Sequence, residues 1–210
     1  MITQRGNILI GANVTTQYEQ TLKRELEGDL PQAFVQTSSL QNKYIDLWNG
    51  TRILYRPFDD PDKLRSYNLT MWVMIEASEI KAEAYHQLKT RLRNMAAAVP
   101  ETDEEGNILY EYDDRGVGVP VIKAEWRRGI IESNPDSGWI RTDVLLPSHQ
   151  IVKHGSVADT YDQTGIEIDP AIATHVASTD VNRFLPKNFI REQTTNKPGW
   201  WVARYIYSSF

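Results

Sequence analysis

The sequence predicts an α/β fold whose central sheet is mainly parallel, with helices on both faces and an added β-hairpin. Three patterns lead to this fold class. Apolar runs at residues 7–10 and 71–75 have the continuous hydrophobicity of strands that are buried on both faces. Stretches with helical spacing follow both runs, so strand and helix alternate along the chain. Between these runs, an Asn49-Gly50 pair predicts a tight hairpin turn.

The first strand and the first helix are predicted near the amino terminus. The run Asn7-Ile8-Leu9-Ile10 ends at Gly11, which is typical of a short buried strand. Thr16 and Glu19 have the spacing of a capping box at the start of a helix, and Gly28 ends the helical pattern. A strand followed directly by a helix favours a parallel layer.

The hairpin and the second buried strand come next. Residues 44–48 and 51–55 are β-prone runs on either side of Asn49-Gly50, which is the strongest local signal in the sequence. Residues 71–75 are apolar at every position and predict a strand that ends in Glu76.

A long helix is predicted from Ser78 to about Ala97, with Pro100 beyond its end. Its apolar positions recur at helical spacing and are Ile80, Ala84, Leu88, Leu92 and Met95. The acidic, turn-rich stretch 101–118 then predicts an inserted hairpin or flap. Its carboxylates could bind a divalent cation, but hydrophilic turns are rich in acids anyway, so a solvated insertion is the favoured interpretation.

The last part of the chain is predicted less sharply. Residues 126–131 suggest a third strand that ends at Glu132, followed by a polar connection. Residues 169–177 fit either a strand or a turn, and 186–192 and 200–207 suggest short helices.

Composition excludes several classes of function. The formal net charge of −5 disfavours a constitutive duplex-binding domain, because such domains neutralise phosphates with Lys and Arg. The absence of Cys excludes disulfides, thiolate metal sites and cysteine nucleophiles. The four histidines lack metal-ligand spacing. No stretch approaches the roughly 20 apolar residues of a membrane span, so a soluble, unexported protein is expected.

The acid at the end of the second strand is the first candidate for chemistry. In nucleotide hydrolases with a parallel sheet, one strand delivers an acid to Mg²⁺ and a neighbouring glutamate orients the attacking water. Glu76 fits the glutamate, whereas Ile75 stands where the paired acid would be expected. A hydrophobic strand that ends in Glu is common in many folds, so this pattern alone is not specific.

Several motifs in order make the pattern specific. They are Trp48-Asn49-Gly50-Thr51, then Asp59-Asp60-Pro61-Asp62-Lys63-Leu64-Arg65, then Val73-Met74-Ile75-Glu76-Ala77-Ser78-Glu79-Ile80. Later matches are Ser133-Asn134-Pro135, the segment from Ser178 to Pro186, and the ending Arg204 to Phe210. In composition, order and spacing, the chain resembles the large terminase subunits of tailed bacteriophages, from about residue 7 to its end.

The resemblance implies that residues 1–210 are part of a terminase ATPase domain. The implied fold is a P-loop NTPase of the ASCE type that is incomplete at its amino terminus, with 101–118 as an acidic hairpin insertion. The implied activity is ATP hydrolysis coupled to translocation of double-stranded viral DNA into a procapsid. Glu76 would be the catalytic glutamate, and Arg65 would act as an arginine finger on a neighbouring subunit. Ser133, Asn134 and Pro135 would form the coupling segment, with Asn134 sensing the nucleotide state.

The resemblance also implies cofactors, partners and a location. ATP and Mg²⁺ would serve the intact family member. Double-stranded DNA, a portal protein and a small terminase subunit would be partners of a homo-oligomeric ring in the cytoplasm of the infected bacterium, with no membrane involved. Strands that end at Gly11, Glu76 and Glu132 should be neighbours, with Glu76 and Asn134 within one side-chain reach.

Three departures from the family pattern affect activity. The Gly-rich Walker A loop with Lys-Ser/Thr occurs nowhere in the sequence, and neither does the acidic nuclease domain that follows the ATPase domain in the family. Ile75 cannot ligate Mg²⁺. The chain by itself is therefore expected to be inactive.

Two alternatives remain open. One is an accessory protein of the same fold that binds DNA or a motor subunit without hydrolysing ATP. The other is an unrelated α/β enzyme that uses Glu76 and Asp46 as acid and base, although the sequence has no Gly-x-Ser-x-Gly elbow.

Overall fold

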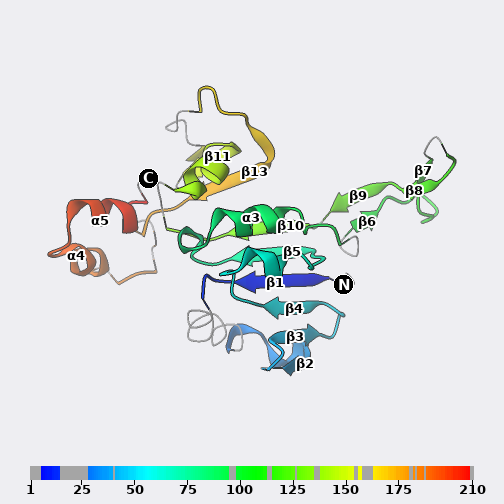
Figure 1. Cartoon of the computed structure of the whole chain (residues 1–210), viewed down its shortest axis with the longest axis horizontal. Coiled ribbons are helices and arrows are strands. Elements are labelled where there is room, and N and C mark those ends of the chain that lie inside the picture. The colour runs from blue at the N-terminus through cyan, green and yellow to red at the C-terminus, as the bar shows by residue number, and fades with distance from the viewer. Residues whose placement is uncertain are drawn as a thin grey trace. The chain divides into compact units, whose positions relative to one another are not determined.

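A computed structural model describes most of the chain, in residues 6–14, 28–39, 41–94, 98–112, 115–125, 127–134, 138–153, 156–157, 163–179, 182, 184–186 and 188–208. The chain divides into two compact units. The first comprises Met1–Ile75 and Glu83–Glu132, and the second comprises Glu76–Ala82 and Ser133–Phe210. Figure 1 shows the elements of both units.

The first unit is built on a six-stranded sheet with the order β10-β5-β1-β4-β3-β2. These strands are β1 (Asn7–Gly11), β2 (Val35–Ser39), β3 (Tyr44–Leu47), β4 (Arg52–Tyr55), β5 (Met71–Met74) and β10 (Arg128–Ile131). Strands β10, β5, β1 and β4 are parallel, whereas β3 and β2 are antiparallel to their neighbours. The prediction of a mainly parallel sheet is confirmed, and the three strands predicted to end at Gly11, Glu76 and Glu132 are neighbours in it.

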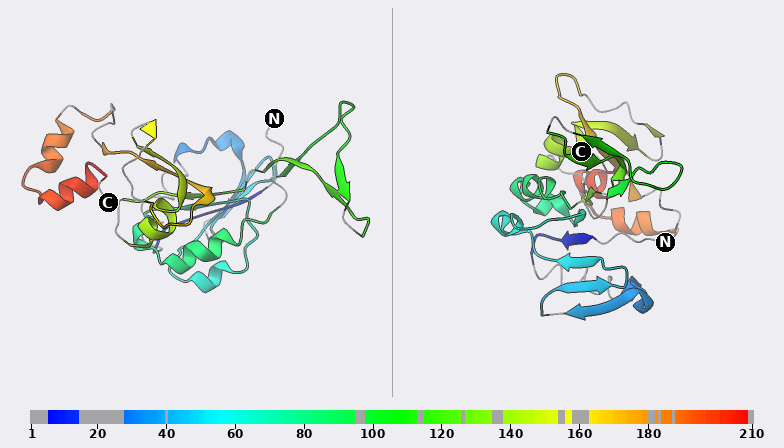
Figure 2. Two further views of the ribbon diagram at one scale, coloured as in Figure 1. Left: turned by 90° about the horizontal axis from the view of Figure 1, so that it is seen from above. Right: turned by 90° about the vertical axis from the view of Figure 1, so that its right-hand side faces the viewer.

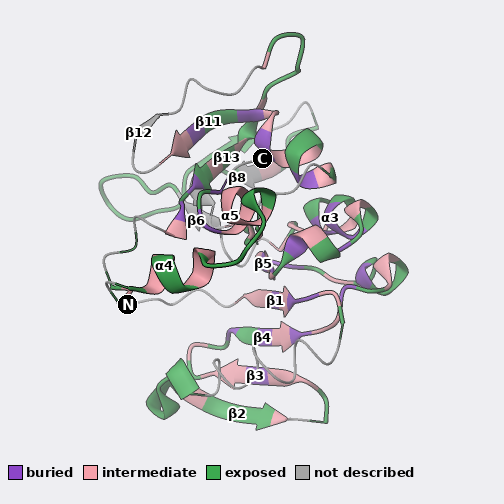
Figure 3. Cartoon of the chain, turned by 90° about the vertical axis from the view of Figure 1, so that its left-hand side faces the viewer, coloured by how far each residue is buried: buried purple, intermediate pink, exposed green. Residues whose placement is uncertain are grey.

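The core of the first unit lies along these parallel strands. Trp72 and Met74 of β5 are buried, as is Leu9 of β1. Helix α3 (Ala82–Lys89) packs on the sheet, where Tyr85 meets Trp72 in an edge-on ring contact with centroids 6.1 Å apart. Burial decreases toward β2, which is mostly exposed (Figure 3). Burial of large side chains between sheet and helix is the main favourable term for this unit.

The hairpin predicted at Asn49-Gly50 joins β3 to β4. Gly50 has a φ of 82°, a backbone conformation that glycine adopts without strain. The Asn49 side chain accepts a hydrogen bond from the Thr51 amide at 3.0 Å, so it closes the turn locally. Because β4 pairs with β1, the hairpin extends the parallel sheet by β3 and then β2.

The long helix predicted for residues 78–97 is wrong in length. Residues Ala77–Glu79 form a short 3-10 helix, η4, and the α-helix ends at Lys89. The chain then returns to the sheet, where the Leu69 amide donates to the Arg91 carbonyl at 2.9 Å and Leu69 forms an isolated bridge with Leu92. Leu92 therefore pairs with Leu69 through the backbone and lies beyond the end of the helix, so its helical spacing from Leu88 is coincidental.

Residues 98–125 form a β-arm that leads away from the sheet (Figures 1 and 2). Its inner ladder pairs β6 (Ala98–Pro100) with β9 (Ile122–Glu125), and its outer ladder pairs β7 (Tyr110–Tyr112) with β8 (Gly118–Pro120). An isolated bridge between Thr102 and Ile108 closes an acidic turn on the way. The ladders pair strands on both sides of the acidic stretch, and the interpretation of 101–118 as an insertion stays a prediction.

The second unit holds a three-stranded sheet that the sequence did not predict. Its order is β12-β11-β13, with β11 (Ser148–Lys153), β12 (Ser156–Val157) and β13 (Asp169–Val176). The segment expected to be a polar connection thus contains β11, β12 and the π-helix η6 (Arg141–Leu145). Leu145, Ile151 and Val176 form the buried cluster of this sheet. Residues 169–177, which fitted either a strand or a turn, contain strand β13.

The remaining elements are short. The two predicted carboxyl-terminal helices are α4 (Phe189–Thr194) and α5 (Gly199–Tyr205), and two 3-10 helices are η2 (Gln32–Phe34) and η3 (Pro61–Leu64). The predicted helix that begins at Thr16 lies almost wholly outside the described residues. Among the described helices, none has the length and apolar character needed to cross a membrane.

Candidate functional site

Three parallel strands of the first unit end together at one edge of its sheet. The Ile75 amide donates to the Gly11 carbonyl at 2.9 Å, and the Glu132 amide donates to the Met74 carbonyl at 2.9 Å. These bonds align the carboxyl ends of β1, β5 and β10. In open parallel sheets, ligands bind in the crevice outside the carboxyl ends of the strands. A ligand site is therefore expected at the segments that follow these strand ends.

Glu76 is the first residue after this edge on the β5 side, and its backbone is strained. It has φ 50° and ψ 50°, the left-handed conformation that residues with a side chain rarely adopt. The η4 turn that follows is anchored by buried Ala77 and Ile80, and the Glu79 amide donates to the Glu76 carbonyl at 3.0 Å. Strained residues of this kind cluster at functional sites, and Glu76 is exposed.

Within the second unit, the segment after β10 is joined to the turn that carries Glu76. The Ser133 hydroxyl accepts a hydrogen bond from the Ser78 amide at 3.0 Å and donates to the Asn134 carbonyl at 2.9 Å. The Trp139 indole donates to the Ile80 carbonyl at 2.7 Å, which holds the other end of the turn. The structure thus brings the acid turn and the predicted coupling segment together.

The two site segments are connected through residues that sequence reasoning missed. Ser78 and Trp139 have no chemical signature in the sequence, and their contacts span 55 and 59 residues. Only the position of Ser78 within the motif from Val73 to Ile80 pointed toward it. Pro135 lies outside the described residues, and the reach between the side chains of Glu76 and Asn134 stays a prediction.

Arg65 belongs to the first unit, at the end of η3. Its guanidinium is exposed and forms an ion pair with Asp62 at 2.8 Å. The Arg65 carbonyl accepts a hydrogen bond from Arg91 at 2.6 Å, which fixes the backbone at this point. The Asp60 carboxylate caps η3 by accepting from the Asp62 amide at 3.1 Å. The Asp-Asp-Pro motif therefore has a structural role in presenting Arg65 on the surface.

The residues fit a water-orienting acid better than a metal or phosphate site. Ile75 is half-buried, and its side chain offers no oxygen ligand beside Glu76. In the part of the chain that the structure describes, no group of three His, Asp or Glu side chains could hold a metal ion. The sequence also lacks the Gly-rich loop with Lys-Ser/Thr that would cradle phosphates.

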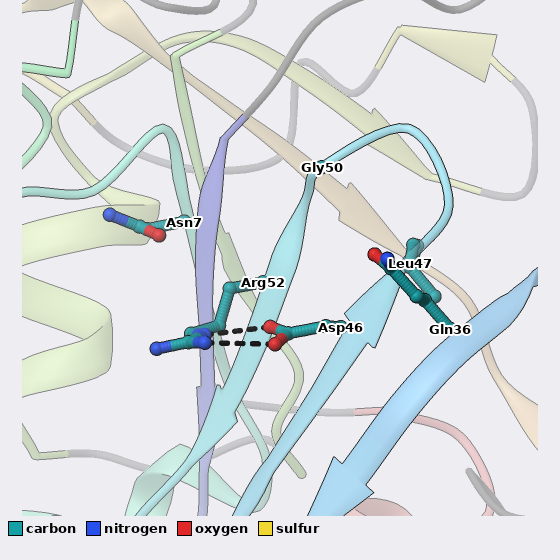
Figure 4. Close-up of a pocket in the computed structure, with 6 residues that line it drawn as sticks. All are labelled: Asn7, Gln36, Asp46, Leu47, Gly50 and Arg52. Atoms are coloured by element: carbon teal, nitrogen blue, oxygen red, sulfur yellow. Dashed lines mark hydrogen bonds and ion pairs between the residues drawn. The ribbon is translucent and has the colours of Figure 1, made fainter.

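A shallow pocket in the first unit lies away from the carboxyl ends of the parallel strands. Its volume is about 310 Å³, and it is lined by Asn7, Gln36, Asp46, Leu47, Gly50 and Arg52 (Figure 4). Asn7 and Arg52 begin β1 and β4, so the pocket lies at the amino ends of these parallel strands, opposite the edge where ligands bind.

Asp46 in this pocket is held by Arg52 in a two-point contact. Arg52 Nε donates to Asp46 Oδ1 at 2.6 Å and Nη2 donates to Oδ2 at 2.8 Å. The hydrogen bond from Arg52 is the main reason why the pKa of the Asp46 carboxyl lies below its ordinary value; partial burial opposes it. A carboxylate that is ionised and paired in this way is a poor proton donor at neutral pH, which argues against an enzyme that uses Asp46 as its acid.

Asp46→Asn is expected to lower the free energy of unfolding by about 0.2–1 kcal/mol at pH 7, the range for partly exposed ion pairs. Because the folded-state pKa is depressed, the stabilisation is present above the unfolded pKa of about 4 and is lost as the pH falls through the folded value. Urea unfolding of both proteins at pH 7 and pH 3 measures it. The difference should shrink at pH 3, and an equal difference at both pH values would contradict this role.

Comparisons with known proteins agree on one family. The family model described as phage terminase large subunit matches residues 18–111. No curated protein matches the chain.

Solved structures match nearly the whole chain. The large terminase of a thermophilic bacteriophage gives a TM-score of 0.60 at 13% sequence identity over 97% of this chain. The complex of the same terminase with ATP-gamma-S gives 0.59 at 12% identity over 98% of this chain. The ATPase domain of the Thermus phage P74-26 large terminase gives 0.55 at 14% identity over 99% of this chain. At identities this low, the structural similarity establishes the fold alone.

The chain spans only part of these relatives. It covers 40% of the first terminase and 77% of the ATPase domain from the Thermus phage. The family match includes the hairpin, the Asp-Asp-Pro turn and Glu76, and the shared fold extends over both units. The model of the phage terminase large subunit family thus matches residues 18–111, and the fold of the chain is similar to that of solved terminase ATPase domains.

Proposed function

We propose that this chain supplies the part that bears the catalytic glutamate of an ATPase that drives double-stranded viral DNA into a procapsid. The observation that carries the proposal is the hydrogen bond between the Ser78 amide and the Ser133 hydroxyl. It joins the turn that bears a strained, exposed glutamate to the segment that leaves the adjacent strand. A solved relative was determined in complex with ADP and with ATP-gamma-S, which supports ATP as the substrate.

Glu76 would act on the attacking water. Its carboxylate accepts a hydrogen bond from the water and takes up a proton as the water oxygen attacks the γ-phosphorus, while the bond from the γ-phosphorus to the ADP oxygen breaks. Mg²⁺, when bound with ATP, would neutralise phosphate charge. The chain's own contribution is to orient the water, and the short η4 turn fixes the backbone from which Glu76 extends.

Ser133 and Asn134 would relay the nucleotide state. The Asn134 amide could hydrogen-bond the water or the γ-phosphate, and its loss of that partner after hydrolysis would shift the segment. Because Ser133 is bonded to both Ser78 and Asn134, such a shift would act on the Glu76 turn as well. Pro135 would limit the conformations of the same segment.

The proposal includes the other parts of a packaging motor. Arg65 would act as an arginine finger in the ATP site of a neighbouring subunit of a homo-oligomeric ring. Its guanidinium would stabilise the charge that develops on the transferred phosphoryl group. Double-stranded DNA, a portal protein and a small terminase subunit would be its partners in the cytoplasm of the infected host.

A second candidate is an accessory protein of the same fold that binds DNA or a motor subunit without hydrolysis. It is favoured by Ile75, which cannot ligate Mg²⁺, and by the absence of a phosphate-binding loop from the sequence. The two candidates differ in whether Glu76 can act once phosphates are held in place.

ATP turnover by the chain, alone and fused to a phosphate-binding segment, tests the proposal. We expect the chain alone to hydrolyse ATP at the background rate, because nothing in its sequence cradles the β- and γ-phosphates. Fusion of the Gly-rich strand and loop of a solved terminase ATPase domain ahead of Asn7 should give turnover of about 0.1–10 s⁻¹, below or near the typical enzyme median.

The matched control is the same fusion with the loop lysine replaced by Ala, which should return turnover to background. Robust hydrolysis by the unfused chain would overturn the assignment of roles. A well-folded fusion that binds ATP but does not hydrolyse it would favour the accessory protein.

A further inference from the structure

The negative charge of the chain is concentrated in the β-arm. Residues 98–125 contain eight of the 28 acidic residues and two of the 23 basic residues, so the formal charge of the arm is −6 and that of all other residues together is +1. The described residues 101–112 of the arm are all exposed. The arm therefore carries a local negative field that the rest of the chain does not share.

The outer part of the arm also exposes large apolar and aromatic side chains. Tyr112 is 72% exposed, and Ile108, Leu109, Tyr110 and Val117 are exposed as well. A two-stranded ribbon with side chains exposed on both faces gains little stability by itself. Tyrosine is enriched at protein interfaces because it combines a large contact area with a polar end. The combination of acidic and aromatic groups fits a partner surface that is basic and partly apolar.

A surface of that kind lies at the root of the arm. The segments that flank the arm, 84–97 and 126–131, contain five basic residues and no acidic residue. These basic residues are Lys89, Arg91, Arg93, Arg127 and Arg128. We call them, together with Ile130, the root surface.

A contact within the first unit holds the two halves of the root surface together, because Arg127 Nη1 donates to the Leu92 carbonyl at 3.1 Å. The Arg128 amide donates to the Thr70 carbonyl at 3.1 Å, which fixes the start of β10 beside β5. Ile130 lies on β10 at the edge of the described sheet and is 46% exposed. The root surface thus combines positive charge, an exposed apolar side chain and a strand edge.

We propose that the arm of one copy docks on the root surface of a second copy, head to tail. The two surfaces are opposite in charge and similar in magnitude, −6 against +5, and each has an apolar part. The arm leads away from its own root (Figures 1 and 2), which leaves the root of another copy as the complementary surface. Such a contact uses different patches on the two partners, so it can propagate into a ring. The proposal names an interface for the proposed motor but does not depend on ATP hydrolysis.

Sedimentation equilibrium of the chain without nucleotide or DNA tests the contact. Self-association is expected at 50 mM salt and should weaken at least tenfold in Kd at 500 mM salt, because the charges are solvent-exposed. Tyr112→Ser should weaken the association as well. Tyr207→Ser, at an exposed tyrosine of the second unit, is the matched control and should leave it unchanged.

Charge reversal identifies the partner surface. One variant reverses the arm with Glu101→Lys, Glu104→Lys, Glu105→Lys and Glu111→Lys, and the other reverses the root with Lys89→Glu, Arg93→Glu and Arg128→Glu. Each alone should be monomeric, because its arm and root then carry the same sign. An equimolar mixture should associate again.

Three results would overturn the proposal. They are a wild-type chain that stays monomeric at low salt, a mixture of folded reversed variants that stays monomeric, and a salt-dependent change in shape at constant mass, which would mean that the arm folds onto its own root.

Discussion

Glu76→Gln in the ATP-hydrolysing fusion is expected to lower kcat by about 10²–10⁴-fold, the usual contribution of a positioned general base. Gln keeps the size and hydrogen-bonding capacity of the side chain but cannot accept the proton that the attacking water loses. The KM for ATP should change little, because the substitution removes an interaction of the transition state and leaves nucleotide binding intact. Steady-state phosphate release over a range of ATP concentrations separates the two constants.

Glu79→Gln is the matched control for this substitution. Glu79 lies in the same short turn as Glu76 and is also exposed, so it tests whether any acid near the strand end affects turnover. Its kcat should stay within about twofold of the parent, as for surface substitutions away from the chemistry. Retention of more than a tenth of kcat by Glu76→Gln would refute the assignment of Glu76 as the catalytic base.

Phe58→Ala is expected to lower the free energy of unfolding by about 3–5 kcal/mol, the usual cost of truncating a buried aromatic residue. The Phe58 side chain is fully buried, and its amide donates to the Ala12 carbonyl at 2.8 Å just beyond β1. A side chain at Gly11 would approach the Phe58 ring to 2.5 Å, so the ring lies directly against the end of this strand. Its loss leaves a cavity beside the sheet edge from which the site segments depart.

Urea unfolding followed by circular dichroism measures this loss. Phe34→Ala is the control, because Phe34 is 59% exposed and its truncation should cost less than about 0.5 kcal/mol. A small effect at Phe58 would mean that the segment after β4 does not pack against β1 in solution.

Local patterns in the sequence predicted much of the first unit. The runs that became β1 and β5 are apolar at successive positions and short, which is typical of strands covered on both faces of a parallel sheet. The Asn49-Gly50 turn was predictable because Gly50 adopts a positive φ and the Asn49 side chain closes the loop within two residues. These signals depend on neighbours in the chain, so no tertiary information was required.

Elements stabilised by distant residues were not predictable in this way. The helix predicted through Ala97 ends at Lys89, since Leu69 draws the chain at Arg91 and Leu92 back to the sheet. Strand β11 pairs with β13 in parallel, with Ser148 opposite Asp169. Neither strand has a strong hydrophobic periodicity in its sequence. Their pairing becomes favourable only when Leu145, Ile151 and Val176 are buried together.

By itself the sequence determined the mainly parallel sheet, the hairpin and the identity of the acid at the strand end, because periodicity, turn residues and motif order are local properties. The left-handed backbone of Glu76 and the bonds from Ser78 to Ser133 and from Trp139 to Ile80 were decided only by the tertiary structure. The reason is physical. A strained backbone and a hydrogen bond across 55 residues persist only when surrounding packing compensates the strain and the loss of chain entropy, and no local pattern encodes that compensation.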